Sequence, residues 1–116
     1  YRVTVELGNV PHVPGQPEDM VMDFKEVKAV LTEEIVACCD HAFLCNTASE
    51  VEKDIAATLR KHGLRVYELP HRSTSELLAK HFFEKIAARG LPVLSVSVSE
   101  TPESRATYCR TATDAL

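Results

Sequence analysis

The sequence lacks the features that mark several large classes of protein. No apolar run approaches the ~18 residues of a membrane-spanning helix. Basic residues number 13 against 17 acidic ones, and the net charge of -4 argues against nucleic acid as a main partner, since phosphate binding favours a basic face. There is also no glycine-rich phosphate loop and no Gly-x-Ser-x-Gly elbow, so the usual nucleotide-binding and serine-hydrolase signatures are absent.

No secretory signal segment is visible, because Glu6, Glu18 and Asp19 interrupt the region where its apolar core would stand. The chain has 116 residues, of which 45% are apolar and 26% charged, which suits a globular domain rather than a disordered segment. We therefore treat residues 1–116 as a single domain and expect a cytoplasmic protein. No internal repeat or low-complexity tract divides it.

Cysteine is too scarce for a disulfide framework. The four cysteines are unevenly spaced, and they are Cys38, Cys39, Cys45 and Cys109. We interpret them as reduced, buried thiols. A metal site at Cys38, His41 and Cys45 is a weaker alternative, because no second ligand pair follows at a usable spacing.

Apolar periodicity predicts the elements in the first part of the chain. Alternation of apolar and polar residues over 3–7 indicates a strand, and the proline- and glycine-rich residues 8–19 indicate a loop. Asp23 stands at an N-cap position before an amphipathic helix over residues 24–38. Residues 40–48 show no regular pattern, and we expect an irregular connection there.

The rest of the chain adds two helices and three strands. The helices lie between residues 49 and 63 and between 73 and 90, and the strands lie at 65–69, 94–99 and 105–111. On local grounds Ser73-x-x-Glu76 is a capping box that opens the last helix. The order of elements predicts a small α+β domain.

Glu100 is the most informative single residue. In a regular strand its side chain shares a face with Leu94, Val96 and Val98, where a carboxylate is costly without a partner. One interpretation places Glu100 at the floor of a cavity, where it accepts hydrogen bonds from a flat pair of N–H groups on a ligand. The other ends the strand at Ser99 and turns Glu100 into solvent.

Asp40 and His41 are adjacent and follow the first helix. A carboxylate beside an imidazole can hold its tautomer and raise its basicity, as acid–base catalysis requires. Alone the pair is weak evidence, because most such pairs are surface residues. The remaining histidines show no ligand spacing.

Taken together, several segments resemble the 6-pyruvoyl-tetrahydropterin synthase family, including its bacterial branch of 6-carboxytetrahydropterin synthases in queuosine biosynthesis. The matching segments are 20–28 (MVMDFKEVK), 40–44 (DHAFL), 73–80 (STSELLAK), 98–101 (VSET) and Tyr108. They occur in the family's order and span nearly the whole chain. Each segment is modest alone, and their combination is fairly specific.

The resemblance implies a T-fold, in which a four-stranded antiparallel sheet carries two long helices on one face. Such subunits join sheet edges into rings, so the resemblance implies a homo-oligomer, expected to be a hexamer, with active sites between subunits. It also implies a zinc-dependent lyase acting on 7,8-dihydroneopterin triphosphate, with 6-carboxy- or 6-pyruvoyl-tetrahydropterin as the product. The partners expected are the pterin substrate and further copies of this chain, without nucleic acid or membrane.

The resemblance also assigns roles to individual residues. Asp40 and His41 match the family's catalytic pair, which assists a cysteine base from a neighbouring subunit. Glu100 matches the glutamate that anchors the pterin ring. Thr74, Ser75 and Glu76 match the segment that borders the pterin pocket.

The chain departs from the family pattern near Tyr1. The family's zinc is held by three histidines, two of them in a His-x-His motif just before the first strand, and its catalytic cysteine lies further upstream. We therefore expect an N-terminal strand and the metal motif before Tyr1, and no metal site within the chain. Residues 45–72 form a longer segment than in the shortest members, and Asn46 stands one place later than in the usual pattern.

Two other functions stay open. The protein could be a non-catalytic, oligomeric pterin-binding module that keeps the pocket without the chemistry. It could also be another T-fold enzyme of purine or pterin metabolism.

Overall fold

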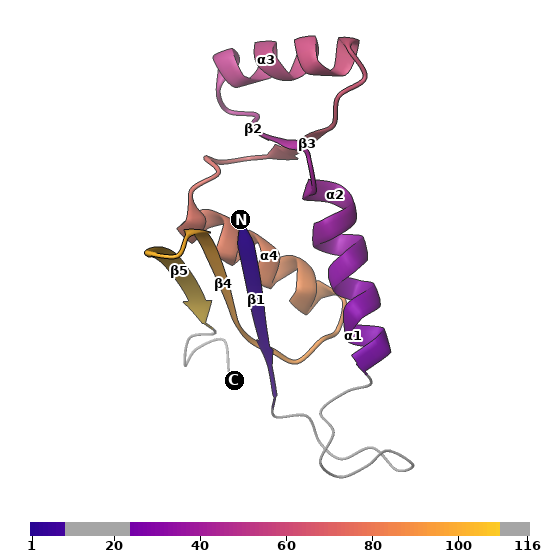
Figure 1. The fold of residues 1–116 in the computed structure, drawn as a ribbon, viewed down its shortest axis with the longest axis vertical. Helices are drawn as coiled ribbons and strands as arrows, with labels where there is room; N and C mark the ends of the chain where they lie inside the picture. The colour runs from indigo at the N-terminus through magenta and orange to yellow at the C-terminus, as the bar shows by residue number, and fades with distance from the viewer. Residues whose placement is uncertain (9–23, 110–116) are drawn as a thin grey trace.

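A three-stranded antiparallel sheet forms the centre of the computed structural model, which describes residues 1–8 and 24–109 (Figure 1). Its strands are β1 (Arg2–Leu7), β4 (Val93–Thr101) and β5 (Ser104–Cys109), in the order β1-β4-β5. Val98 of β4 lies opposite Val3 on one side and Ala106 on the other. The strands predicted at 3–7, 94–99 and 105–111 are thus confirmed as far as the described residues extend.

Helices pack against this sheet, as expected for an α+β fold (Figure 1). Helix α4 (Ser75–Ala88) lies on the sheet, and a helical stretch of three parts packs beside α4. Its parts are α1 (Phe24–Leu31), a π-helical turn η1 (Thr32–Val36) and α2 (Ala37–Cys39). This stretch confirms the helix predicted over 24–38, although its periodicity gave no sign of the π-helical turn.

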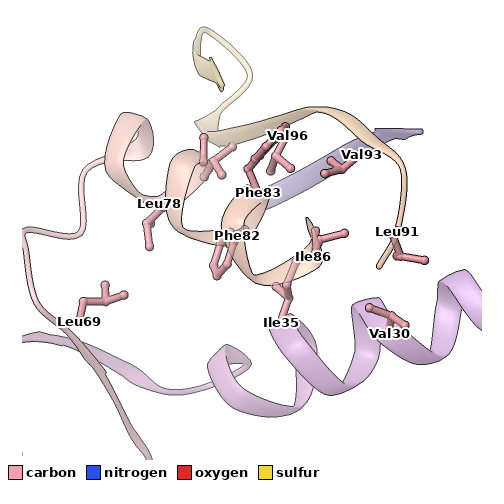
Figure 2. Packing of buried hydrophobic residues seen from close by; sticks show 12 residues of the cluster. Val30, Ile35, Leu69, Leu78, Phe82, Phe83, Ile86, Leu91, Val93 and Val96 are labelled. Carbon is pink, nitrogen blue, oxygen red and sulfur yellow. The ribbon is translucent and has the colours of Figure 1, made fainter. Parts of the chain in front are cut away.

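The hydrophobic core lies between the sheet, α4 and the first helical stretch. Figure 2 shows the side chains of α4 between those of β4 and those of α1 and η1. The buried residues drawn there include Val30, Ile35, Leu78, Phe82, Phe83, Ile86, Val93 and Val96. The Phe83 ring also meets Tyr108 of β5 edge-on, with centroids 4.9 Å apart, a favourable aromatic arrangement.

A second, smaller unit lies beyond one end of the sheet (Figure 1). Strands β2 (Phe43–Asn46) and β3 (Val66–Leu69) pair in parallel and are joined by α3 (Glu50–Lys61). The expectation of irregular structure over 40–48 is therefore wrong. The four residues of β2 are too short for an alternation signal, and a parallel strand depends on a partner that is distant in sequence.

The helix ends follow from local chemistry, with one correction. Ser49 is the N-cap of α3, because its Oγ accepts a hydrogen bond from the Glu52 amide at 3.3 Å. At α4, however, the cap is Thr74 rather than Ser73, because Thr74 Oγ1 accepts from the Leu77 amide at 3.3 Å. Gly63 follows α3 with φ 77, a conformation that glycine adopts without penalty.

The structure bears on the other expectations only in part. The antiparallel sheet with packed helices is confirmed, but the described residues form three antiparallel strands and a separate parallel pair rather than four antiparallel strands. The predicted loop over 8–19, apart from Gly8, and the Asp23 cap lie outside the described residues. Among residues 1–8 and 24–109, no helix combines the length and apolar character needed to cross a bilayer.

Candidate functional site

A pocket of about 500 Å³ lies where the start of α4 meets the end of β4. All four residues to which the resemblance assigns pterin binding line it, and they are Thr74, Ser75, Glu76 and Glu100. The other lining residues are Glu52, Arg72, Ser73, Ser104, Arg105 and Ala106. We call this cavity the Glu100 pocket. The fold thus gathers two groups that are far apart in sequence.

The N-terminus of α4 forms one wall of the Glu100 pocket. Thr74 caps the helix, Ser75 is buried with only 8% of its surface exposed, and Glu76 is exposed in the first turn. The first turn of a helix presents backbone N–H groups without helical partners. The wall therefore supplies donors from the backbone beside acceptors from side chains, which suits a flat heterocycle that carries both kinds of group.

The structure corrects the predicted environment of Glu100. Its side chain is exposed and does not continue the buried face of β4. The pairing with β5 passes from Ser99 opposite Arg105 to Thr101 opposite Ser104, so Glu100 is an extra residue in a β-bulge. A bulge interrupts the alternation of side chains along a strand. The prediction for Glu100 assumed that this alternation continues through residue 100. The strand itself extends past Ser99 to Thr101.

Three charged residues of the Glu100 pocket are absent from the sequence-based prediction. Glu52 of α3 accepts a hydrogen bond from the Asn46 amide through Oε1 at 3.0 Å. Arg72 and Arg105 are exposed, and neither guanidinium forms an ion pair with another described residue. Their only sequence signal is proximity, since Arg72 precedes the segment 73–76 and Arg105 follows the turn after Glu100.

Asp40 and His41 lie in a different pocket, of about 420 Å³. We call it the His41 pocket. Its walls are mainly apolar, and the remaining lining residues are Tyr1, Val3, Ile35, Val36, Cys39, Ala42, Leu44, Leu78 and Phe82. The two pockets share no lining residue. Within residues 1–8 and 24–109, the fold therefore does not bring the predicted catalytic pair and the predicted pterin anchor into one cavity.

His41 occupies a tight turn between α2 and β2. Its φ is 56, and it is a non-glycine residue in the left-handed region, which is uncommon. The turn is held by Asp40, whose amide donates to the Val36 carbonyl at 2.9 Å and whose carbonyl accepts from Arg65 Nη1 at 2.9 Å. Backbone strain of this kind is concentrated at functional sites.

The two side chains of this predicted pair are close but not hydrogen-bonded. His41 Nε2 lies 3.8 Å from Asp40 Oδ2, and the two side chains are 90% and 60% exposed. Both groups are therefore available to a ligand or to another chain. The predicted tautomer-holding hydrogen bond is not formed in this arrangement.

The thiols only partly match expectation. Cys38, Cys39, Cys45 and Cys109 are all free, but only Cys45 is buried and Cys109 is exposed. Burial raises the pKa of the Cys45 thiol, and it raises the pKa of Cys39 to about 11, so neither is an activated nucleophile. No three His, Cys, Asp or Glu side chains among the described residues converge as metal ligands. The described residues therefore do not fit the zinc that the resemblance implies.

Comparison with known proteins identifies relatives over nearly the whole chain. The family model described as 6-pyruvoyl tetrahydropterin synthase matches residues 1–111. A 6-carboxy-5,6,7,8-tetrahydropterin synthase from Haemophilus influenzae is 30% identical over 109 residues, which cover 93% of this chain and 77% of that protein. The similarity thus covers both pockets.

Proposed function

Because the chain belongs to the 6-pyruvoyl tetrahydropterin synthase family, we propose that it is a pterin-pathway lyase acting on 7,8-dihydroneopterin triphosphate. The name of the Haemophilus relative favours 6-carboxytetrahydropterin over 6-pyruvoyl-tetrahydropterin as the product. The former product would assign the reaction to queuosine biosynthesis, as the resemblance implies.

The observation that carries this proposal is the composition of the Glu100 pocket. A pterin presents an amino group and a ring N–H side by side, and the Glu100 carboxylate can accept both. Arg72 and Arg105 border the same cavity without a carboxylate partner among the described residues, and guanidinium groups match phosphate oxygens. One cavity therefore offers complementary groups for both ends of a phosphorylated pterin.

Asp40 and His41 supply the proposed acid–base chemistry. Reaction of the substrate side chain requires removal of a carbon-bound proton, and an imidazole can take up or relay a proton near neutral pH. The Asp40 carboxylate lies beside this imidazole, with Oδ2 3.8 Å from His41 Nε2. The zinc and the cysteine base implied by the resemblance would come from groups other than the described residues, so we assign no step through them.

The separation of the two pockets supports an active site formed between copies of the chain. The catalytic pair of one copy could meet the Glu100 pocket of a neighbour, and neither copy alone would have a complete site. Among the described residues, β1 and β5 each pair with only one strand, and open strand edges favour further pairing. We therefore propose a ring-shaped homo-oligomer, a hexamer by the family resemblance.

The test is turnover of 7,8-dihydroneopterin triphosphate by the complete protein, with products identified by mass spectrometry. We expect His41→Ala to lower kcat by roughly 10²–10⁴-fold, the usual contribution of a general acid–base group. His62→Ala removes an exposed histidine outside both pockets and should leave turnover unchanged. Equal effects of the two substitutions would contradict a catalytic role for His41.

Glu100→Gln tests the pterin anchor in the same assay. It removes the charge and replaces an acceptor with a donor, so pterin affinity should fall by about 30- to 1000-fold. Glu84→Gln makes the same change on an exposed part of α4 and is the control. Pterin binding without product would favour the binding-module alternative, and turnover of a different purine or pterin would favour another enzyme of this fold. A failure to bind or convert any pterin would overturn the proposal.

A further inference from the structure

The register of the central sheet brings Tyr1 beside Glu100. β1 and β4 run antiparallel with Arg2 opposite Ser99 and Val3 opposite Val98. Extending this register by one residue sets Tyr1 opposite Glu100, and side chains of directly opposed residues interact across strands. Tyr1 OH donates a hydrogen bond to Glu100 Oε1 at 3.1 Å. Of the contacts made by Glu100 within the described residues, this is the one polar contact of its carboxylate.

This hydrogen bond joins the two pockets. Tyr1 lines the His41 pocket, whereas Glu100 lines the other pocket. Tyr1 is 64% exposed, but partial burial raises the pKa of its hydroxyl, and the hydrogen bond and charge of Glu100 raise it further. The hydroxyl therefore keeps its proton at neutral pH and remains a donor to the carboxylate.

The Glu100 side chain is exposed, so a specific partner is needed to hold its carboxylate in one orientation. Glu100 is the extra residue of the bulge in β4. A free glutamate side chain loses rotamer freedom when it binds a ligand, and this loss weakens binding. A carboxylate oxygen has two lone pairs, so Oε1 can accept from Tyr1 and still accept from a ligand.

We propose that Tyr1 is a positioning residue for Glu100, whose carboxylate it orients before a pterin binds. This inference rests on the proposed function, because it assumes that Glu100 anchors the pterin. The Tyr1 hydroxyl then contributes to pterin affinity and takes no part in the reaction itself. Loss of the hydroxyl should weaken pterin binding and raise KM while leaving kcat within about twofold.

The experiment measures neopterin affinity for the complete protein by a ligand-observed titration, which reaches millimolar dissociation constants. Tyr1→Phe keeps the ring in the His41 pocket and removes only the hydroxyl, and we expect affinity to fall about 3- to 10-fold. Tyr108→Phe removes a hydroxyl that makes no hydrogen bond within the described residues, and it should leave affinity unchanged.

A double-mutant cycle separates positioning from a general structural effect. In a Glu100→Ala background there is no carboxylate to orient, so Tyr1→Phe should cause no further loss of affinity. An equal loss in both backgrounds would show that Tyr1 acts through the fold and would overturn the inference. Affinity that depends on Glu100 but not on Tyr1 would overturn it while sparing the proposed function. If the unaltered complete protein does not bind neopterin, the proposed function itself is overturned.

Discussion

His41 combines a proposed catalytic side chain with an uncommon backbone conformation. It belongs to the predicted catalytic pair, and it also has φ 56 without being glycine. A left-handed residue with a Cβ atom carries a conformational cost that the surrounding structure must offset. Here the hydrogen bonds of the Asp40 amide and the Asp40 carbonyl hold the turn in place. The exposed imidazole is thereby directed by backbone geometry rather than by side-chain packing.

This strain leads to a prediction about stability. His41→Gly should be more stable than His41→Ala by about 1 kcal/mol, because only glycine relieves the penalty of positive φ. Urea unfolding of both variants measures the difference. At His62, where φ is -95, the same two substitutions should rank in the opposite order. Equal stabilities of His41→Gly and His41→Ala would contradict the left-handed conformation.

At the scale of elements, a hydrogen-bonded network ties α4 to β3 and to η1. Lys85 Nζ donates to the Tyr67 hydroxyl at 3.0 Å and lies 3.4 Å from a Glu34 carboxylate oxygen. An ammonium group can only donate, so the Tyr67 hydroxyl accepts from Lys85 and keeps its own proton available for His81 Nε2, which lies 2.7 Å away. Donation from Tyr67 to Nε2 corresponds to a neutral His81 with its proton on Nδ1.

The network predicts a pH dependence of stability. Burial lowers the pKa of His81 from 6.5, and the charges of Lys85 and His71 lower it further against an opposing effect of Glu84. The unfolded chain then binds a proton more readily than the folded one, so stability falls as pH drops below about 6.5, until the folded pKa is passed. Unfolding free energies measured at pH 7.5 and 5.5 should show this loss.

The matched variant is His81→Gln, which keeps an acceptor for Tyr67 but does not titrate. Its loss of stability between the two pH values should be smaller than that of the unaltered protein. His62→Gln removes an exposed histidine and should behave like the unaltered protein. If His81→Gln and the unaltered protein lost equal stability, the Tyr67–His81 hydrogen bond would not be a pH-sensitive contact.

The two longer amphipathic helices differ in how much of their apolar surface the fold uses. Ile86 of α4 is fully buried, whereas Ile55 of α3 is 44% exposed. Ile86→Ala should therefore cost about 2–5 kcal/mol of unfolding free energy by leaving a cavity in the core. Ile55→Ala should change it by less than about 1 kcal/mol, measured by the same urea titration. Similar costs at the two positions would indicate that α3 is covered in the intact protein.

At the scale of the whole molecule, a site shared between copies predicts complementation. His41→Ala and Glu100→Gln should each be nearly inactive, but a mixture unfolded and refolded together should regain activity. If each site takes His41 from one copy and Glu100 from its neighbour, equal random mixing leaves about a quarter of the sites intact. Sedimentation of the complete protein at micromolar concentration should show an oligomer. A monomer, or a mixture without activity, would contradict a shared site.

Much of the fold could be predicted because the elements carry local signals. Alternation of apolar residues identified β1 and β4, and apolar periodicity located α3 and α4, although the cap of α4 is Thr74 rather than Ser73. β2 was missed because its four residues carry no pattern without the parallel partner β3. Strand parity and adjacency singled out Glu100, Asp40 and His41, whereas the family resemblance assigned their roles and added the segment 74–76. The structure places these residues in two pockets.

The sequence by itself determined which faces are apolar and where helices begin and end, because these depend on periods of two or 3.6 residues and on hydrogen bonds within one turn. Only the tertiary structure decided that Glu100 leaves its strand's alternation, that Arg72 and Arg105 border its pocket, and that Tyr1 holds its carboxylate. These contacts join residues up to 99 positions apart. Chain topology and a β-bulge create them, and no local pattern encodes either.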